Sequence, residues 1–184
     1  PVLKVMEESG RIRRGYFVAG VAATQFARPA AVDLLRDLRV QADEPECVSL
    51  ASTDPANPYG AALGWPTSIP AEPDAVLPAF ARAVGTRVVL VDGALAAFLR
   101  HGNTDVGVFL PEAEPDRGRT GRALATELAL IASTGEGRRG GLLIGTINGR
   151  PAGQHELARY LVEAGFLASA MGYYLPRRRR DSGD

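Results

Sequence analysis

The chain has 184 residues, 46% of them hydrophobic, so it is long enough to bury a core in one domain or two small ones. Its 21 basic and 21 acidic residues balance, and any attraction to DNA must therefore come from local clusters. The single cysteine, Cys47, excludes an internal disulfide framework and a cysteine-rich zinc site, and no apolar run is long enough for a bilayer span. These features favour a cytoplasmic protein without a membrane partner.

The first forty residues predict a helix, two strands and a second helix. Residues 2–9 have the pattern of a helix end that Gly10 stops, and with no initiator methionine we expect a piece of a longer polypeptide. Glycines interrupt the apolar segment 15–27, which is typical of a strand that bends before a second strand. Pro29 can begin a helix to about residue 39, with one apolar face made of Ala31, Leu34, Leu35 and Leu38.

The middle of the chain predicts strands joined by tight turns. Residues 47–53 read as a strand that the turn-rich segment 53–60 stops, and a proline-rich loop then leads to a short helix around 78–84. Residues 87–110 contain three apolar runs separated by Asp-Gly and His-Gly-Asn turns. This pattern predicts an antiparallel meander.

The last third alternates helix and strand. A polar connection over 111–121 precedes a helix over 123–133, and residues 140–149 form a strand closed by Asn-Gly. A further helix from Gln154 ends at Gly165 and Phe166, the pattern of a left-handed cap, before a final strand over 171–176. Together the elements predict an α+β fold with a curved antiparallel sheet or a small β-barrel-like module, since two-residue turns cannot make parallel crossovers.

Motifs for known chemistry are scarce. The chain has no phosphate-binding GxxxxGK[ST] loop, so we expect no ATP hydrolysis by these residues. His101 and His155 lie outside any HExxH pattern and read as surface histidines, and we expect no metal site. The segment TDPANPYG offers a candidate polar loop of Asp54, Asn57 and Tyr59, in which the carboxylate either acts as a general base or simply makes the turn.

Three arginine clusters are candidates for nucleic-acid contact. The segment RIRRGYF combines guanidinium groups with aromatic rings, the composition of single-strand binders, although alternation along a strand lets only one of Tyr16 and Phe17 reach the surface. The candidate nucleic-acid-binding residues are Arg11, Arg13, Arg14, Tyr16, Arg138, Arg139, Arg177 and Arg178. The last two belong to a run of four arginines that is either a phosphate-binding tail or a solvated one.

Four ordered strings carry a resemblance to a known family. They are GRIRRGYFVAGVAATQFARPAAVDLLR, LASTDPANPYGAALGWP, RVVLVDGALAAFLRHG, and LLIGTINGRPA with LVEAGFLASAMGYYLPR. In this order they resemble the carboxy-terminal portion of the large helicase-related (Lhr) proteins, ATP-dependent DNA helicases linked to repair, over nearly the whole chain. RRGYF and TDPANPYG are the most specific parts.

The resemblance implies how domains and functions are distributed along a longer protein. Residues 1–10 would end the last winged helix, residues 11–176 would form the terminal β-barrel-like module, and 177–184 would be an Arg-rich tail. The motor, with its ATP and Mg²⁺, would lie upstream, and this fragment would need no cofactor of its own. Its architecture would be similar to that of alkylpurine DNA glycosylases, but their paired-glutamine pattern has no match because Gln25 stands alone.

Three functions remain open at this point. The first is an accessory module that binds single-stranded DNA or repair intermediates and packs against upstream modules, in the cytoplasm with the nucleoid. The second is a base-excision glycosylase domain acting on a flipped base. The resemblance assigns no catalytic residue for it, and what remains for a hydrolytic role is the loop 54–59, Asn148, Asp181 and Asp184. The third is an oligomerisation or interdomain scaffold, for which an uncovered edge strand would serve.

Overall fold

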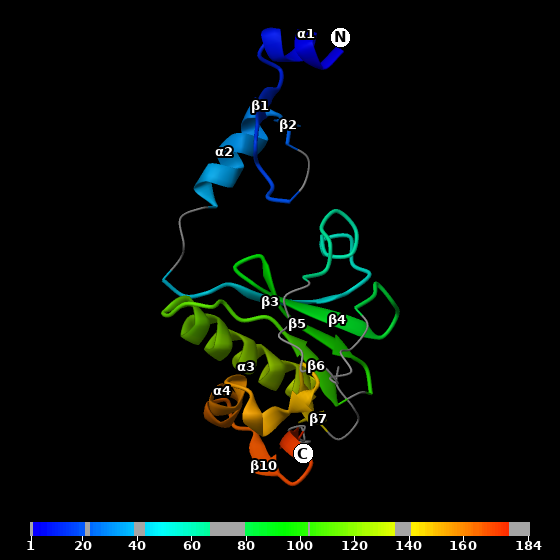
Figure 1. Cartoon of the computed structure of the whole chain (residues 1–184), viewed down its shortest axis with the longest axis vertical. Coiled ribbons are helices and arrows are strands. Elements are labelled where there is room, and N and C mark those ends of the chain that lie inside the picture. Colours follow the sequence, from blue (N-terminus) through cyan, green and yellow to red (C-terminus); the bar gives the residue numbers. More distant parts are fainter. Residues whose placement is uncertain are drawn as a thin grey trace, which may run out of the picture. The chain divides into compact units, whose positions relative to one another are not determined.

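The computed structural model describes residues 2–20, 23–38, 43–66, 80–102, 104–134 and 141–176. The chain forms two compact units, residues 1–43 and 44–184, which are coloured along the sequence in Figure 1. The implied boundary after residue 10 stays a prediction, and the division by compactness falls after Asp43. No helix in the described ranges is long and apolar enough to cross a membrane.

The first unit consists of a helix, a hairpin and a helix. Helix α1 spans Val2–Glu8, strands β1 (Arg13–Gly15) and β2 (Gln25–Ala27) pair antiparallel, and α2 spans Pro29–Asp37. Gly10 ends α1 at a φ of 72°, where the N–H of Arg11 reaches the carbonyl of Met6. Pro29 occupies the first turn of α2, where its missing N–H costs nothing.

The apolar face predicted for α2 does not form a core in the described structure. Among the described residues of this unit only Ile12 and Val32 are buried. Leu34, Leu35 and Leu38 are exposed, the last by 71%. The helix was therefore predicted correctly, but its buried residue is Val32, which is not one of the residues predicted for the apolar face.

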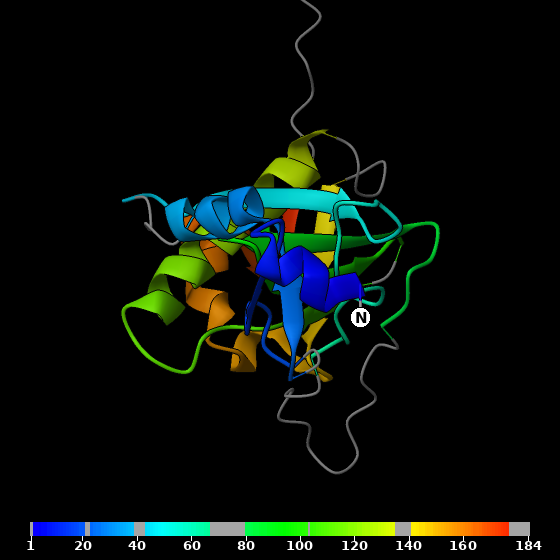
Figure 2. The same ribbon diagram turned by 90° about the horizontal axis from the view of Figure 1, so that it is seen from above.

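The second unit is built on a six-stranded sheet. Its strands are ordered β3 (Cys47–Ala51), β4 (Thr86–Val91), β5 (Ala94–Arg100), β6 (Asp105–Val108), β8 (Thr146–Ile147) and β9 (Arg150–Pro151). In the turned view β3 runs along the sheet edge beside β4 (Figure 2). The meander from β4 to β6 confirms the prediction, with Asp92 and Gly93 at positive φ in the first turn.

One feature of this sheet departs from the expected antiparallel pattern. Strands β6 and β8 pair parallel, and the crossover between them runs through α3 (Asp116–Thr134) and β7 (Gly141–Ile144). The tight turns could not reveal this pairing because it joins segments forty residues apart. Within the described ranges β3 and β9 are free ends of an open sheet, so the α+β fold is confirmed and no sheet closes into a barrel.

A helical layer covers one face of the sheet. Helices α3 and α4 (Leu157–Glu163) pack there with a smaller sheet ordered β10 (Leu167–Ser169), β11 (Gly172–Pro176) and β7 (Figure 1). The core includes Val89, Leu124, Leu128, Ile144 and Leu161. Gly165 at a φ of 94° and the buried Phe166 end α4 as predicted.

Helix α3 begins earlier than the sequence indicates. The segment 111–121 reads as a polar connection, yet α3 starts at Asp116 and contains the buried Gly118 and Gly121. A Cβ on Gly121 would lie 2.5 Å from the ring of Tyr160, so the glycine allows α4 to pack closely. The glycines therefore act as packing positions and do not break the helix.

The opposite face of the sheet carries a second, aromatic cluster. Val88, Leu90, Leu95 and Phe98 pack with Trp65, Phe80 and Phe109, and the rings of Phe80 and Phe98 meet edge to face at 5.2 Å between centroids. The short helix expected at 78–84 is absent over its described part, 80–84. The chain is not helical there because the hydroxyls of Ser52 and Thr86 bond to its backbone at Ala81 and Ala83.

Candidate nucleic-acid interface

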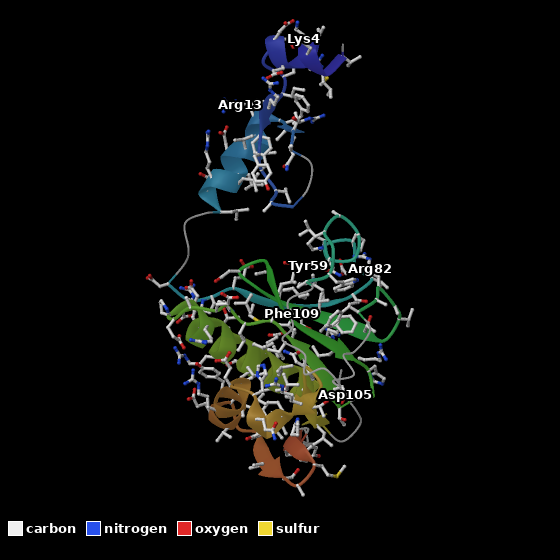
Figure 3. All side chains as sticks on the ribbon, in the orientation of Figure 1. Lys4, Arg13, Tyr59, Arg82, Asp105 and Phe109 are labelled. Carbon is white, nitrogen blue, oxygen red and sulfur yellow. The ribbon has the colours of Figure 1, made fainter. Side chains whose placement is uncertain are left out.

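The hairpin β1–β2 presents the arginines of the first candidate cluster. Arg11, Arg13 and Arg14 are all exposed, over a stretch that runs from the end of α1 into β1 (Figure 3 labels Arg13). In β1, Arg13 lies opposite Ala27 and Arg14 lies opposite Phe26. Because successive side chains of a strand alternate, the two guanidinium groups project from different faces of the hairpin.

Ion pairing separates these arginines into two kinds. Arg14 Nε lies 3.4 Å from Glu7 Oε1, and this pair is partly exposed to solvent. Within the described residues, neither Arg11 nor Arg13 has a carboxylate partner. These two guanidinium groups therefore keep their hydrogen-bond donors available for an anionic ligand.

One of the two adjacent aromatic residues is exposed and the other is not, as expected, although both lie in the loop after β1 and not in the strand. Tyr16 is 64% exposed, whereas Phe17 is half-buried and its ring lies against Gly15, where a Cβ would approach to 2.7 Å. The N–H of Gly20 donates to the hydroxyl of Tyr16 at 3.2 Å. Tyr16 is thus the aromatic residue that can contribute to the basic surface.

Gln25 is a structural residue that sequence reasoning did not assign. Its Oε1 accepts hydrogen bonds from the N–H groups of Phe17 and Val18, at 3.0 and 2.8 Å, and its Nε2 donates to the carbonyl of Val18 at 2.7 Å. One side chain on β2 therefore holds the loop that follows β1. The only signal in the sequence was a lone glutamine beside Phe26 in an otherwise apolar segment.

The remaining arginines of the prediction lie outside the described residues. They are Arg138, Arg139, Arg177 and Arg178. Their role in nucleic-acid contact stays a prediction.

The candidate polar loop lies in the second unit and is largely occupied by its own hydrogen bonds. Asn57 is only 1% exposed, and its Nδ2 donates to the carbonyls of Ser52 and Tyr59 at 2.8 and 3.2 Å. Asp54 Oδ1 accepts from the N–H of Ala56, and the hydroxyl of Tyr59 accepts from the N–H of Leu95. These contacts are those of a turn, while a chemical role for Asp54 stays a prediction.

Arg82 holds this loop from the other side of the proline-rich segment. Its guanidinium donates to four carbonyls, including that of Asn57 at 2.7 Å and that of Asp54 at 3.1 Å. Arg82 and Tyr59 lie close together in Figure 3. No local pattern predicted this contact, because the partners are about 25 residues apart.

A groove of about 680 Å³ lies elsewhere in the second unit. Its walls combine an aromatic and apolar strip with polar side chains, and include Phe109, Leu110, Glu112, Arg117, His155 and Glu156. His155 Nδ1 accepts from the N–H of Leu157 at 3.1 Å, which leaves the proton of a neutral ring on Nε2. Burial lowers the pKa of His155, with a smaller opposing effect from Glu156, and so favours that neutral form.

Asn148 and Cys47 do not supply a reactive group here. Asn148, at the edge of the groove, exchanges hydrogen bonds with the backbone of Val108, accepting at 2.7 Å and donating at 2.8 Å. Burial raises the pKa of the Cys47 thiol to about 12, so it is not a nucleophile at neutral pH. In the described ranges, no three His, Cys, Asp or Glu side chains gather as a metal site would require.

Comparison of the sequence with known proteins identifies a family for this chain. A family model described as the winged-helix domain of the large helicase-related protein matches residues 1–47, which include the whole β1–β2 hairpin. Over 152 residues, 80% of this chain, the sequence is 42% identical to the "Lhr helicase/ probable uracil glycosylase" of Mycolicibacterium smegmatis. The chain belongs to the Lhr family.

A second Lhr relative supports the assignment. The "Lhr helicase/uracil glycosylase" of Escherichia coli is 35% identical over 172 residues, or 91% of this chain. The chain spans 9% and 10% of the lengths of these two relatives, so it corresponds to a small segment of an Lhr protein. Within this Lhr segment, the hairpin between α1 and α2 lies in the matched winged-helix region, and hairpin β1–β2 with the residues that flank β1 is called the wing below.

Proposed function

We propose that this segment is a nucleic-acid-binding accessory module of an Lhr protein, and that it grips the DNA phosphate backbone with the arginines of its wing. The observation that supports this most directly is the exposure of Arg11 and Arg13 without carboxylate partners in the described structure. Phosphate contacts of this kind are independent of sequence and position a protein on DNA. ATP and Mg²⁺ would act in the motor of the parent protein.

The neutral net charge of the chain is compatible with this role. Attraction that comes from a few local guanidinium groups gives weak binding with a measurable salt dependence. Each phosphate that an arginine neutralises contributes about −0.9 to the slope of log K against log salt for duplex DNA. The wing alone is therefore expected to give a slope of about −2 to −3.

A salt titration of DNA binding tests the proposal. Fluorescence anisotropy should show reduced affinity for Arg11→Ala/Arg13→Ala and a slope smaller in magnitude by about 2. Arg36→Ala is the matched control, because Arg36 is also exposed in the first unit but pairs with Asp33 at 3.2 Å. Binding that is undetectable, independent of salt, or weakened equally by both variants would overturn the proposal.

A second candidate is base excision, in which the groove beside His155 holds a flipped base. The names of both relatives include uracil glycosylase, and the groove offers what a base pocket needs. Phe109 and Leu110 provide apolar walls, neutral His155 provides a donor, and the carboxylates of Glu112 and Glu156 provide acceptors. In the reaction, water adds at C1′ of the deoxyribose while the base leaves with the electrons of the glycosidic bond and takes up a proton.

An incision assay separates this candidate from binding alone. The chain would be incubated with a uracil-containing oligonucleotide, followed by cleavage at abasic sites. Strand scission that Glu112→Gln lowers at least tenfold, while the exposed Glu163→Gln does not, would support the groove. Absence of scission by the wild-type chain would reject glycosylase activity for this segment, and scission that both variants retain would move the site elsewhere.

A further inference from the structure

We infer that the wing carries a stacking surface for an unpaired base, namely the ring of Tyr16, and that this segment selects DNA with an unpaired nucleotide over fully paired duplex. This inference rests on the proposed DNA-binding function and adds the class of DNA recognised. It depends on three features of the first unit: the exposure of the ring, the bracing of the loop, and the neighbouring arginines.

The first feature is that Tyr16 is exposed yet held in place. Its side chain is 64% exposed, so most of the ring is accessible to a ligand. The hydroxyl is tied to the N–H of Gly20 at 3.2 Å, so the ring is anchored at one end while most of its surface faces solvent. The next ring, Phe17, packs on Gly15 and anchors the loop from the inside.

The second feature is the bracing of the loop by Gln25. The carboxamide forms three hydrogen bonds with the backbone of Phe17 and Val18, all between 2.7 and 3.0 Å. A loop that is ordered before binding loses less conformational entropy when the ligand arrives. The wing therefore presents Tyr16 in one arrangement instead of many.

The third feature is the distance between charge and ring. Tyr16 lies just beyond the end of β1 and follows Arg13 by three residues, at most about 10 Å of chain, so one strand of DNA can contact both side chains. Guanidinium groups on the backbone together with an aromatic face for a base are the two elements of single-strand recognition. Bases inside a duplex are already stacked, and only an unpaired base can use the ring.

The test compares three DNA probes that share one sequence: a blunt duplex, the same duplex with one unpaired 2-aminopurine, and the single strand. Anisotropy measures affinity, and the fluorescence of 2-aminopurine falls when the base stacks. We expect Tyr16→Ala to weaken binding to the bulged and single-stranded probes about tenfold and to remove the quenching, with duplex binding within twofold of wild type. Tyr16→Trp keeps an aromatic face and should restore both signals.

Two further variants keep the outcome interpretable. Gln25→Ala leaves the ring but removes its brace, and should give a smaller loss on the same two probes. Arg11→Ala/Arg13→Ala should weaken all three probes alike. Circular dichroism of each variant would show that the fold is retained.

The result also separates this inference from the proposed function. If the wild-type chain binds none of the probes, the DNA-binding function itself fails. If it binds but Tyr16→Ala lowers the affinity for all three probes equally, or for none, the stacking inference alone is wrong. Failure of Tyr16→Trp to restore quenching would also overturn it.

Discussion

The two units of this chain use their polar side chains in opposite ways. In the first unit, two residues are buried among those described, and the arginines of the wing point to solvent. In the second, two apolar clusters surround the sheet, and Asn57 and Asn148 are buried with their hydrogen bonds satisfied. Order at the wing therefore comes from a hydrogen-bonded side chain, Gln25, whereas order in the larger unit comes from packing.

The largest effect on stability is expected from removing a buried polar side chain of the second unit. Asn57→Ala leaves the carbonyls of Ser52 and Tyr59 without their side-chain donor in a buried site. We expect the free energy of unfolding to fall by about 3 kcal/mol, measured by urea denaturation.

Asp54→Ala is the matched control in the same loop. Asp54 is only half-buried and accepts one local hydrogen bond, so its loss should cost less than about 1 kcal/mol. If the wild-type chain excises uracil, a large loss of excision in Asp54→Ala with unchanged stability would contradict the structural interpretation of this loop. It would support instead a chemical role for the carboxylate.

A smaller effect is expected from filling the contact between α3 and α4. Gly121→Ala places a methyl group against the buried ring of Tyr160, although alanine favours the helix by about 1 kcal/mol over glycine. Overpacking usually costs about 1–3 kcal/mol, so we expect a net loss of up to about 2 kcal/mol in denaturant unfolding. The exposed Gly153, whose Cβ would have open space apart from one contact at 3.9 Å, is the position for a control substitution to alanine.

The smallest effect concerns the pH dependence of stability at His155. Burial lowers its pKa in the folded state, so the unfolded chain binds a proton first as the pH falls. The contribution of neutral His155 to the free energy of unfolding is therefore fully present above about pH 6.5, the pKa of histidine in the unfolded chain. It is lost as the pH falls from there through the lower pKa of the folded state.

His155→Asn tests this dependence because asparagine keeps an acceptor for the N–H of Leu157 but does not titrate. Below pH 6.5 the slope of stability against pH should become shallower, by at most about 1.4 kcal/mol per pH unit. Thermal unfolding between pH 5 and 8 measures it. An unchanged slope would show that His155 does not contribute, and His101→Asn, in an exposed turn, serves as the control.

Local signals in the sequence predicted much of the fold. Asp92-Gly93 fixed the first turn of the meander, and Gly165 with Phe166 marked the end of α4, because both depend on neighbouring residues alone. That only one of Tyr16 and Phe17 is exposed was also expected, although both residues lie in the loop after β1 and not in the strand. The wing arginines could be named because charge next to aromatic residues is visible without a structure.

What the sequence could not predict depends on contacts between distant residues. Gly118 and Gly121 resemble helix breakers until Tyr160 is seen packed against them. Arg82 could not be assigned to the polar loop, and the parallel pairing of β6 with β8 could not be seen from turns. Gln25 was missed for the same reason, since its partners in the loop lie seven and eight residues away across the hairpin.

The junction between β6 and the β8–β9 hairpin has a consequence for chemical ageing. Asn148 precedes Gly149, and its amide nitrogen is the atom that donates to the carbonyl of Val108. Hydrolysis of that carboxamide would replace the donor with a carboxylate oxygen facing a carbonyl oxygen in a buried site. A single deamidation there would weaken the parallel pairing of β6 with β8 in the described sheet. Old preparations of this protein should therefore lose order first at these two strands.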